Sequence, residues 1–140
     1  MLLTKLIHPE ILEALASAGH GSKVLIADGN YPMATATALG ARLVYLNLRP
    51  GQLLVDDILA AIVNSIAVEA VEVMQPDDGP EPSIFSRFRE VLPDHDLIRQ
   101  RRADFYSAAR DQTVALAIAS GDQRHFANIL LTVGVAPEQH

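Results

Sequence analysis

A histidine between two glycines is the first pattern in the chain that could carry out chemistry. Gly19, His20 and Gly21 follow one another, and flanking glycines leave the histidine backbone unshielded and free in its dihedral angles. An imidazole gives or takes a proton near neutral pH, so a ring presented in this way suits proton transfer to a ligand. The alternative interpretation is an ordinary exposed histidine in the loop after a helix. The pattern alone leaves both interpretations open.

A carboxylate ends the first strongly apolar segment of the chain. Residues 23–28 read Lys-Val-Leu-Ile-Ala-Asp and predict a buried strand that stops at Asp28. Ligands of α/β sheets bind beyond the carboxyl ends of strands, so Asp28 is a candidate for binding or proton transfer. The alternative is an Asx turn, in which Asp28 and Asn30 bond to their own backbone.

Three residues in the C-terminal half complete the set of candidates. Asn128 begins the last predicted strand, and its amide offers the donors and the acceptor that sugar hydroxyls require. Phe126 either stacks on a sugar face or lies in the core, and core is the commoner place for phenylalanine. Arg102 is either a ligand-binding cation or a solvated residue at a strand end. Together these residues indicate a small-molecule site.

Other kinds of site lack their sequence patterns. The five histidines, at positions 8, 20, 95, 125 and 140, show no metal-ligand spacing, and the chain has no cysteine. It also has no P-loop, no dinucleotide-binding glycine pattern and no nucleophile elbow. We therefore expect neither a metal nor a cofactor.

The charge balance and the hydropathy pattern narrow the range of partners. The formal net charge is −6, and the only cationic cluster is Arg99, Arg101 and Arg102, which argues against nucleic-acid binding. No apolar run is long enough to cross a membrane, and the N-terminal residues lack the pattern of a signal peptide. A chain without cysteine suits the reducing cytoplasm. A small neutral ligand fits this composition best.

Helical and extended patterns alternate along the chain, which predicts an α/β domain. Several strands are apolar on both faces, as in a central sheet covered on both sides. No linker divides residues 1–140, so we expect one domain. Helices are expected from Pro9 to a stop at Gly19 and over 33–39, 54–66, 83–91 and 103–110, and strands over 23–28, 42–48, 68–74, 96–101, 114–120 and 128–133.

Several segments together resemble one family. They are Ile-His-Pro-Glu-Ile-Leu-x-x-Leu-Ala at 7–16, the Gly-His-Gly segment, the strand ending at Asp28 with a proline at 32, Arg-Ala-Asp-Phe-Tyr at 102–106, and Ala-Asn-Ile-Leu-Leu-x-x-Gly-Val-x-Pro at 127–137. In this order and spacing they are similar to the L-fucose mutarotase / D-ribose pyranase family, over nearly the whole chain. The Gly-His-Gly and Arg-x-x-Phe-Tyr segments resemble the fucose branch more than the ribose branch.

The resemblance implies a fold, an assembly and roles for individual residues. It implies a three-layer α/β/α domain with a central mixed sheet, assembled into a ring-like homo-oligomer, such as a decamer, with sites near the subunit contacts. By position, His20 resembles the family's catalytic proton donor. Asp28, Arg102 and the segment Phe126-Ala127-Asn128 fall where the family binds sugar. We expect His20 and Asp28 to share one pocket, within a chain or across adjoining copies.

The implied activity is that of a cofactor-independent mutarotase, which interconverts the anomers of a free monosaccharide, L-fucose or a related sugar, by general acid–base ring opening and closure. Two positions depart from the family pattern. Phe126 stands where the family usually has tyrosine, and Gly29-Asn30 follow Asp28 where the fucose branch typically has Ala-His. The alternatives are pyranase-type interconversion of six- and five-membered rings, and monosaccharide binding without catalysis.

Overall fold

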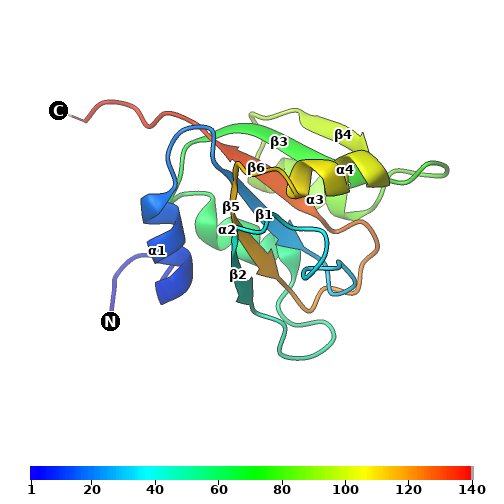
Figure 1. Ribbon diagram of the computed structural model, residues 1–140, viewed down its shortest axis with the longest axis horizontal. Coiled ribbons are helices and arrows are strands. Elements are labelled where there is room, and N and C mark those ends of the chain that lie inside the picture. The colour runs from blue at the N-terminus through cyan, green and yellow to red at the C-terminus, as the bar shows by residue number, and fades with distance from the viewer. Residues whose placement is uncertain (140) are drawn as a thin grey trace.

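Apolar segments that are buried on both faces form the centre of the structure, a computed structural model that describes residues 1–139 (Figure 1). Six strands make one sheet, and four helices lie against its faces. The helices are α1 (Pro9–Ser17), α2 (Val55–Ile62), α3 (Ile84–Val91) and α4 (Arg102–Ala109), and the strands are β1 (Lys23–Ala27), β2 (Arg42–Tyr45), β3 (Val68–Gln75), β4 (Leu97–Arg101), β5 (Val114–Ala119) and β6 (Ile129–Val133).

The strand directions bring the ends of distant segments to one edge of the sheet. The order is β2-β5-β1-β6-β3-β4. β6 is antiparallel to both of its neighbours, β1 and β3, and the other neighbouring pairs are parallel. The five parallel strands therefore end at the edge where β6 begins. We call this edge the carboxyl edge, and it is where ligands of such sheets are expected to bind.

Alternating side chains divide the interior into two apolar clusters, one on each face of the sheet. On one face, Val24 and Ile26 of β1 pack with apolar residues from α1, α2 and α3. On the other face, Leu25 and Ala27 pack with Phe105 of α4 and with the segment of residues 31–41. Figure 1 shows α4 in front of the sheet, with α2 and α3 behind it. The predicted α/β class, with its central mixed sheet between two outer layers, is confirmed.

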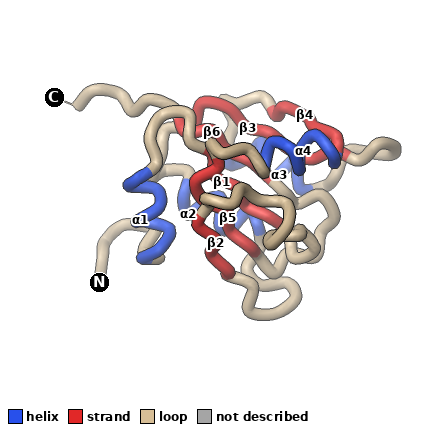
Figure 2. The backbone as a smooth tube through the Cα atoms, viewed as in Figure 1, coloured by secondary structure: helices blue, strands red, loops and turns tan. Residues whose placement is uncertain are grey.

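The expected helix over residues 33–39 is wrong. This segment forms successive turns and crosses the same face of the sheet as α4, which Figure 2 shows as a loop. Its carbonyl groups bond to side chains instead of to a helical backbone. The Tyr31 hydroxyl donates to the Ala36 carbonyl, Thr37 donates to the Met33 carbonyl, and Arg110 donates to the Thr35 carbonyl. These competing bonds replace the helical ladder.

The other predicted elements are present with shifted ends. α1 begins at Pro9 as expected, with the His8 side chain accepting from the Ile11 backbone N–H, but it ends at Ser17 with Ala18 as its C-cap. The strand expected over 42–48 ends at Tyr45. α4 begins at Arg102, one residue before the predicted helix, so that Arg102 opens a helix at the carboxyl edge. Among the described helices, none combines the length and the apolar character that crossing a membrane requires.

Candidate functional site

A polar pair lies at the centre of the carboxyl edge, where β1 ends and β6 begins. The Asp28 backbone N–H donates to Oδ1 of Asn128 at 2.8 Å, and Nδ2 of Asn128 donates to Oδ2 of Asp28 at 3.1 Å. Both side chains are buried. The reversed direction of β6 makes this pair possible, because it places the residue before β6 beside the residue after β1.

The buried Asp28 carboxylate takes part in a turn with its own backbone and also lines a hollow. Its Oδ1 accepts from the Asn30 backbone N–H at 2.9 Å, which is the expected Asx turn, and the same carboxylate also faces a hollow. Burial raises the pKa of the Asp28 carboxyl above its ordinary value, and the hydrogen bonds from Asn30 and Asn128 offset only part of this effect. Each carboxylate oxygen can accept a further hydrogen bond from a ligand.

A hollow of about 160 Å³ lies above this pair. Arg102 at the start of α4 and Phe126 in the loop before β6 form one wall, with the Arg102 guanidinium carbon 5.8 Å from the centre of the Phe126 ring. Phe126 is half-buried and has a φ of 63°, a left-handed conformation that is uncommon for a residue other than glycine. The lining residues are Asp28, Asn30, Tyr31, Met74, Arg102, Tyr106, His125, Phe126 and Asn128. We call this hollow the edge cavity.

Four of the predicted site residues therefore meet in the edge cavity: Asp28, Arg102, Phe126 and Asn128. Ala127 does not line it, because its side chain is fully buried in the apolar cluster on the α2 face. Its contribution is to fill the core beneath the loop. The Phe126 ring packs against the core and also lines the cavity.

His20 lies at the opposite edge of the sheet from Asp28. His20 lies in the loop before β1, and its Nε2 is 3.1 Å from Oε1 of Glu69 at the start of β3. At least half of each side chain is exposed. β1 has five residues, which at about 3.3 Å per residue separates the two edges by roughly 16 Å. Within one chain, His20 and Asp28 share no pocket.

Five residues that line the edge cavity were not predicted as part of a site: Asn30, Tyr31, Met74, Tyr106 and His125. The sequence assigned Asn30 only to a turn with Asp28. Met74 lies near the end of β3, and the rule that placed Asp28 at the carboxyl edge could have indicated it as well. Tyr106 lies one helical turn after Arg102, so the start of α4 could have indicated it. Tyr31 and His125 come from irregular loops, for which no periodicity gives a position.

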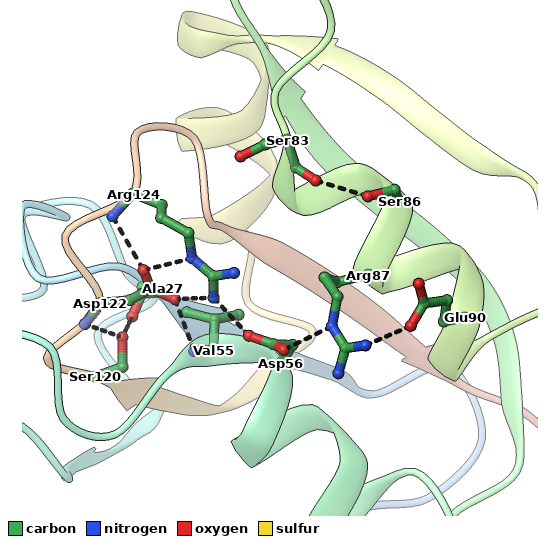
Figure 3. Close-up of polar contacts among 10 residues, drawn as sticks. All are labelled: Ala27, Val55, Asp56, Ser83, Ser86, Arg87, Glu90, Ser120, Asp122 and Arg124. Carbon is green, nitrogen blue, oxygen red and sulfur yellow. Dashed lines mark hydrogen bonds and ion pairs between the residues drawn. The ribbon is translucent and has the colours of Figure 1, made fainter.

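The loop before β6 is anchored by a buried ion network (Figure 3). The fully buried Asp122 carboxylate accepts from the Arg124 side chain at 2.6 Å and from the Val55 backbone N–H at 2.9 Å, at the start of α2. Arg124 also reaches Asp56 at 2.5 Å, and Arg87 of α3 donates to the same carboxylate at 3.1 Å. The network ties the loop to two helices on the far face of the sheet.

The charges in this network stabilise one another. Burial by itself raises the pKa of Asp122, but the hydrogen bonds from Arg124 and Val55 outweigh it and lower the pKa below its ordinary value. The pKa of Asp56 is lowered in the same way by Arg124 and Arg87. The carboxylates of Asp122 and Asp56 are therefore paired with arginines within the fold. Asp28 is the buried carboxylate of the edge cavity that has no cationic partner among the hydrogen bonds and ion pairs within residues 1–139.

A second, larger hollow of about 510 Å³ adjoins the edge cavity and shares Asn30 and His125 with it. It lies between the loop after β2 and the loop after β5. Within residues 1–139, no group of three or more histidine, aspartate or glutamate side chains is arranged to hold a metal ion. The polar groups of the edge cavity are instead hydrogen-bonding groups: a carboxylate, two amides, a guanidinium, two phenols and an imidazole.

Comparisons with known proteins extend over nearly the whole chain. A model of the RbsD / FucU transport protein family matches residues 1–136. The fucose mutarotase of Streptococcus pneumoniae, solved in complex with L-fucose, has a TM-score of 0.84 and 23% sequence identity, over 98% of this chain and 100% of that one.

Two further solved structures are similar. RbsD of Bacillus subtilis, complexed with D-ribose, has a TM-score of 0.81 and 21% identity, over 98% of this chain and 100% of that one. FucU of Bifidobacterium longum has a TM-score of 0.79 and 28% identity, over 94% and 96%. All three share the fold described above.

Proposed function

The chain belongs to the RbsD / FucU transport protein family, and on this premise we propose that it is a cytoplasmic sugar mutarotase that uses the edge cavity. The observation that carries the proposal is the pairing of Asp28 with Asn128 at the floor of that cavity. A small polar hollow with an acidic floor suits a free monosaccharide better than a charged or extended ligand. L-Fucose or a related sugar is the substrate class we propose.

The edge cavity offers each kind of contact that a sugar needs. Asp28 accepts hydrogen bonds from hydroxyls, Arg102 donates them, and Asn128 does both. The Phe126 ring gives an apolar surface for the carbon–hydrogen face of a pyranose. Because Arg102 lies over this ring, it can reach hydroxyls at the rim of the same face.

Mutarotation needs only two proton transfers. A base removes the proton of the anomeric hydroxyl, an acid protonates the ring oxygen, and the bond between C1 and the ring oxygen breaks with its electron pair going to that oxygen. The open-chain aldehyde turns about its C1–C2 bond and closes with both transfers reversed. The reaction already proceeds slowly in water, so general acid–base help of about 10²–10⁴-fold makes a useful catalyst.

We propose that His20 reaches the cavity of a neighbouring copy in a homo-oligomer, such as the decameric ring that the family resemblance implies. His20 is exposed and lies at the opposite edge from Asp28. It therefore cannot act on a sugar held by Asp28 of its own chain, but its position suits a contact between copies. In this arrangement His20 would serve as the proton donor, and Asp28 would orient the sugar or His20.

Saturation-transfer NMR on L-fucose, D-ribose and related monosaccharides tests the activity. We expect faster exchange between the anomers of at least one sugar when the protein is added. Exchange between pyranose and furanose forms of D-ribose in the same panel would favour the pyranase alternative. A panel in which no sugar exchanges faster would refute the activity.

Mixed oligomers test the contribution of His20 from a neighbour. We expect His20→Ala and Asp28→Ala each to lose exchange alone. Co-refolding the two variants restores intact sites at about a quarter of the positions in a ring if each site joins two copies, and at none if each site lies within one copy. A mixture as inactive as its parts would contradict the shared site, and a His20→Ala variant with unchanged exchange would remove His20 from the mechanism.

Sugar binding without catalysis is the second candidate function, because Phe126 has no hydroxyl to move a proton. Calorimetry would then detect binding of a monosaccharide in the absence of faster exchange. Restoration of exchange by Phe126→Tyr would support this candidate further, and Phe126→Leu serves as the control for packing.

A further inference from the structure

His125 lies at the rim of the edge cavity, between this cavity and the adjoining hollow. Its side chain is exposed. The hydrogen bonds within residues 1–139 involve the rings of His8, His20 and His95 and leave both ring nitrogens of His125 available. Of the histidines in the described part of the chain, His125 is the one in the same cavity as Asp28. An available imidazole beside a buried carboxylate is a combination that suits acid–base chemistry.

The loop that carries His125 is fixed on its N-terminal side. The Ser120 hydroxyl donates to the Ala27 carbonyl at 2.7 Å and accepts from the Asp122 backbone N–H at 3.2 Å. Asp122 in turn accepts from both the backbone and the side chain of Arg124, the residue directly before His125 (Figure 3). The backbone is therefore held to the end of β1 and to α2 up to position 124.

The same loop is fixed on its C-terminal side. Asn128 is joined to Asp28 by two hydrogen bonds, and Ala127 is buried in the core. Between these anchors, the left-handed backbone of Phe126 turns the chain. Only His125 and Phe126 separate the two anchored parts, so the backbone that carries the His125 ring has a defined place beside the cavity rim.

We propose that His125 is a catalytic residue of the edge cavity, which exchanges a proton with the sugar held by Asp28 and Asn128. The inference rests on the proposed mutarotase function and deepens it. A neutral His125 removes the proton of the anomeric hydroxyl as the bond between C1 and the ring oxygen breaks, while a second acid protonates the ring oxygen. The resulting imidazolium returns its proton when the ring closes, so no net proton is consumed.

The charged surroundings of His125 come from several elements. Asp28 follows β1, Arg102 and Tyr106 lie on α4, and Tyr31 lies in the segment after β1. Asp122 and Arg49 line the adjoining hollow together with His125. Asp122 is paired with Arg124, which leaves Asp28, Arg49 and Arg102 as the other charged groups that line the two hollows beside His125.

Exchange NMR on the sugar that responds to the wild-type protein tests His125. We expect His125→Ala to lower the maximal exchange rate by about 100-fold, with little change in the sugar concentration for half-maximal rate. His125→Gln, which keeps a polar side chain, should lose as much. Gln123→Ala, two residues earlier in the same loop, should exchange at the wild-type rate. Because His125 is exposed, thermal unfolding of both histidine variants should match that of the wild type.

Two readouts separate proton transfer from a structural role. The maximal exchange rate should fall in His125→Ala while the sugar concentration for half-maximal rate stays near the wild-type value. Added imidazole should restore part of the rate of His125→Ala beyond its effect on sugar alone, and should leave Gln123→Ala unchanged. Unchanged exchange in both histidine variants, or a loss confined to apparent sugar affinity, overturns the inference while the mutarotase function stands. A wild-type protein without exchange on any sugar overturns both.

Discussion

Replacing Arg124 by methionine should remove the cation that pairs with Asp122 and Asp56 and anchors the loop before β6. Methionine has similar length and no charge, so the variant leaves the fully buried Asp122 carboxylate with two backbone hydrogen bonds, from Val55 and from residue 124, and no cationic partner. Loss of one partner from a buried ion pair costs about 3–5 kcal/mol. Because 32% of the Arg124 side chain is exposed and Asp56 keeps Arg87, we expect the lower end of that range, about 3 kcal/mol.

Chemical denaturation at a fixed protein concentration measures this loss, since assembly makes stability depend on concentration. For a domain of this size the same loss lowers the melting temperature by about 10 °C. The matched control is Arg89→Met, which removes an exposed ion pair with Glu81 and should change stability far less. The double variant Asp122→Asn/Arg124→Met should lose less than the sum of the single variants, because no charge remains buried without a partner.

The dependence on pH gives a sharper test. The lowered pKa of Asp122 in the wild type contributes stability above the unfolded-state pKa of about 3.9, and this contribution is lost as the pH falls through the folded-state value. Without Arg124, burial becomes the main influence and favours the protonated carboxyl. The difference between variant and wild type should therefore shrink as the pH is lowered from neutrality toward 4. A loss under about 1 kcal/mol, or one independent of pH, would refute this reasoning.

Three further results are expected. Gly121→Ala should destabilise the fold by at least about 1–3 kcal/mol in denaturation, because a Cβ there would lie 1.8 Å from the Gln52 carbonyl oxygen; a silent variant would contradict this packing. Tyr31→Phe should cost about 1–3 kcal/mol, because the buried Ala36 carbonyl loses its hydroxyl donor, and retained stability would argue against that bond. Carbon-13 NMR should show the Asp28 carboxyl titrating above its ordinary range, because burial raises its pKa. The protonated carboxyl stabilises the fold at low pH, and this contribution is lost as the pH rises through the folded-state pKa. A resonance that titrates below the ordinary range would show that burial does not dominate.

The sequence predicts the edge at which the site lies better than it predicts the residues that surround it. The sequence indicates Asp28 because an apolar run ends directly before it, and Asn128 because another apolar run begins directly after it. Each follows from strand periodicity together with the preference of ligands for one edge of a parallel sheet. The family resemblance independently indicated the same two positions, as well as Arg102.

The residues that were missed depend on contacts between distant segments. His125 lies at the cavity because Arg124 is held by Asp122 and Asp56, and nothing near position 124 indicates residue 56. The segment of residues 33–39 has a composition compatible with a helix, yet its carbonyl groups bond to the side chains of Tyr31, Thr37 and Arg110. Local propensity is a weak guide where such tertiary bonds compete with the helical ladder.

The central position of the reversed strand also affects how the chain can fold. β6 lies between β1 and β3, which do not pair with each other. Without β6 the sheet would be two separate ribbons, β2-β5-β1 and β3-β4, each with an unprotected inner margin. During synthesis, the inner edges of these two ribbons stay unpaired until residues 129–133 insert between them. Asn128, which directly precedes β6, completes the floor of the edge cavity, so the cavity and the joined sheet form together.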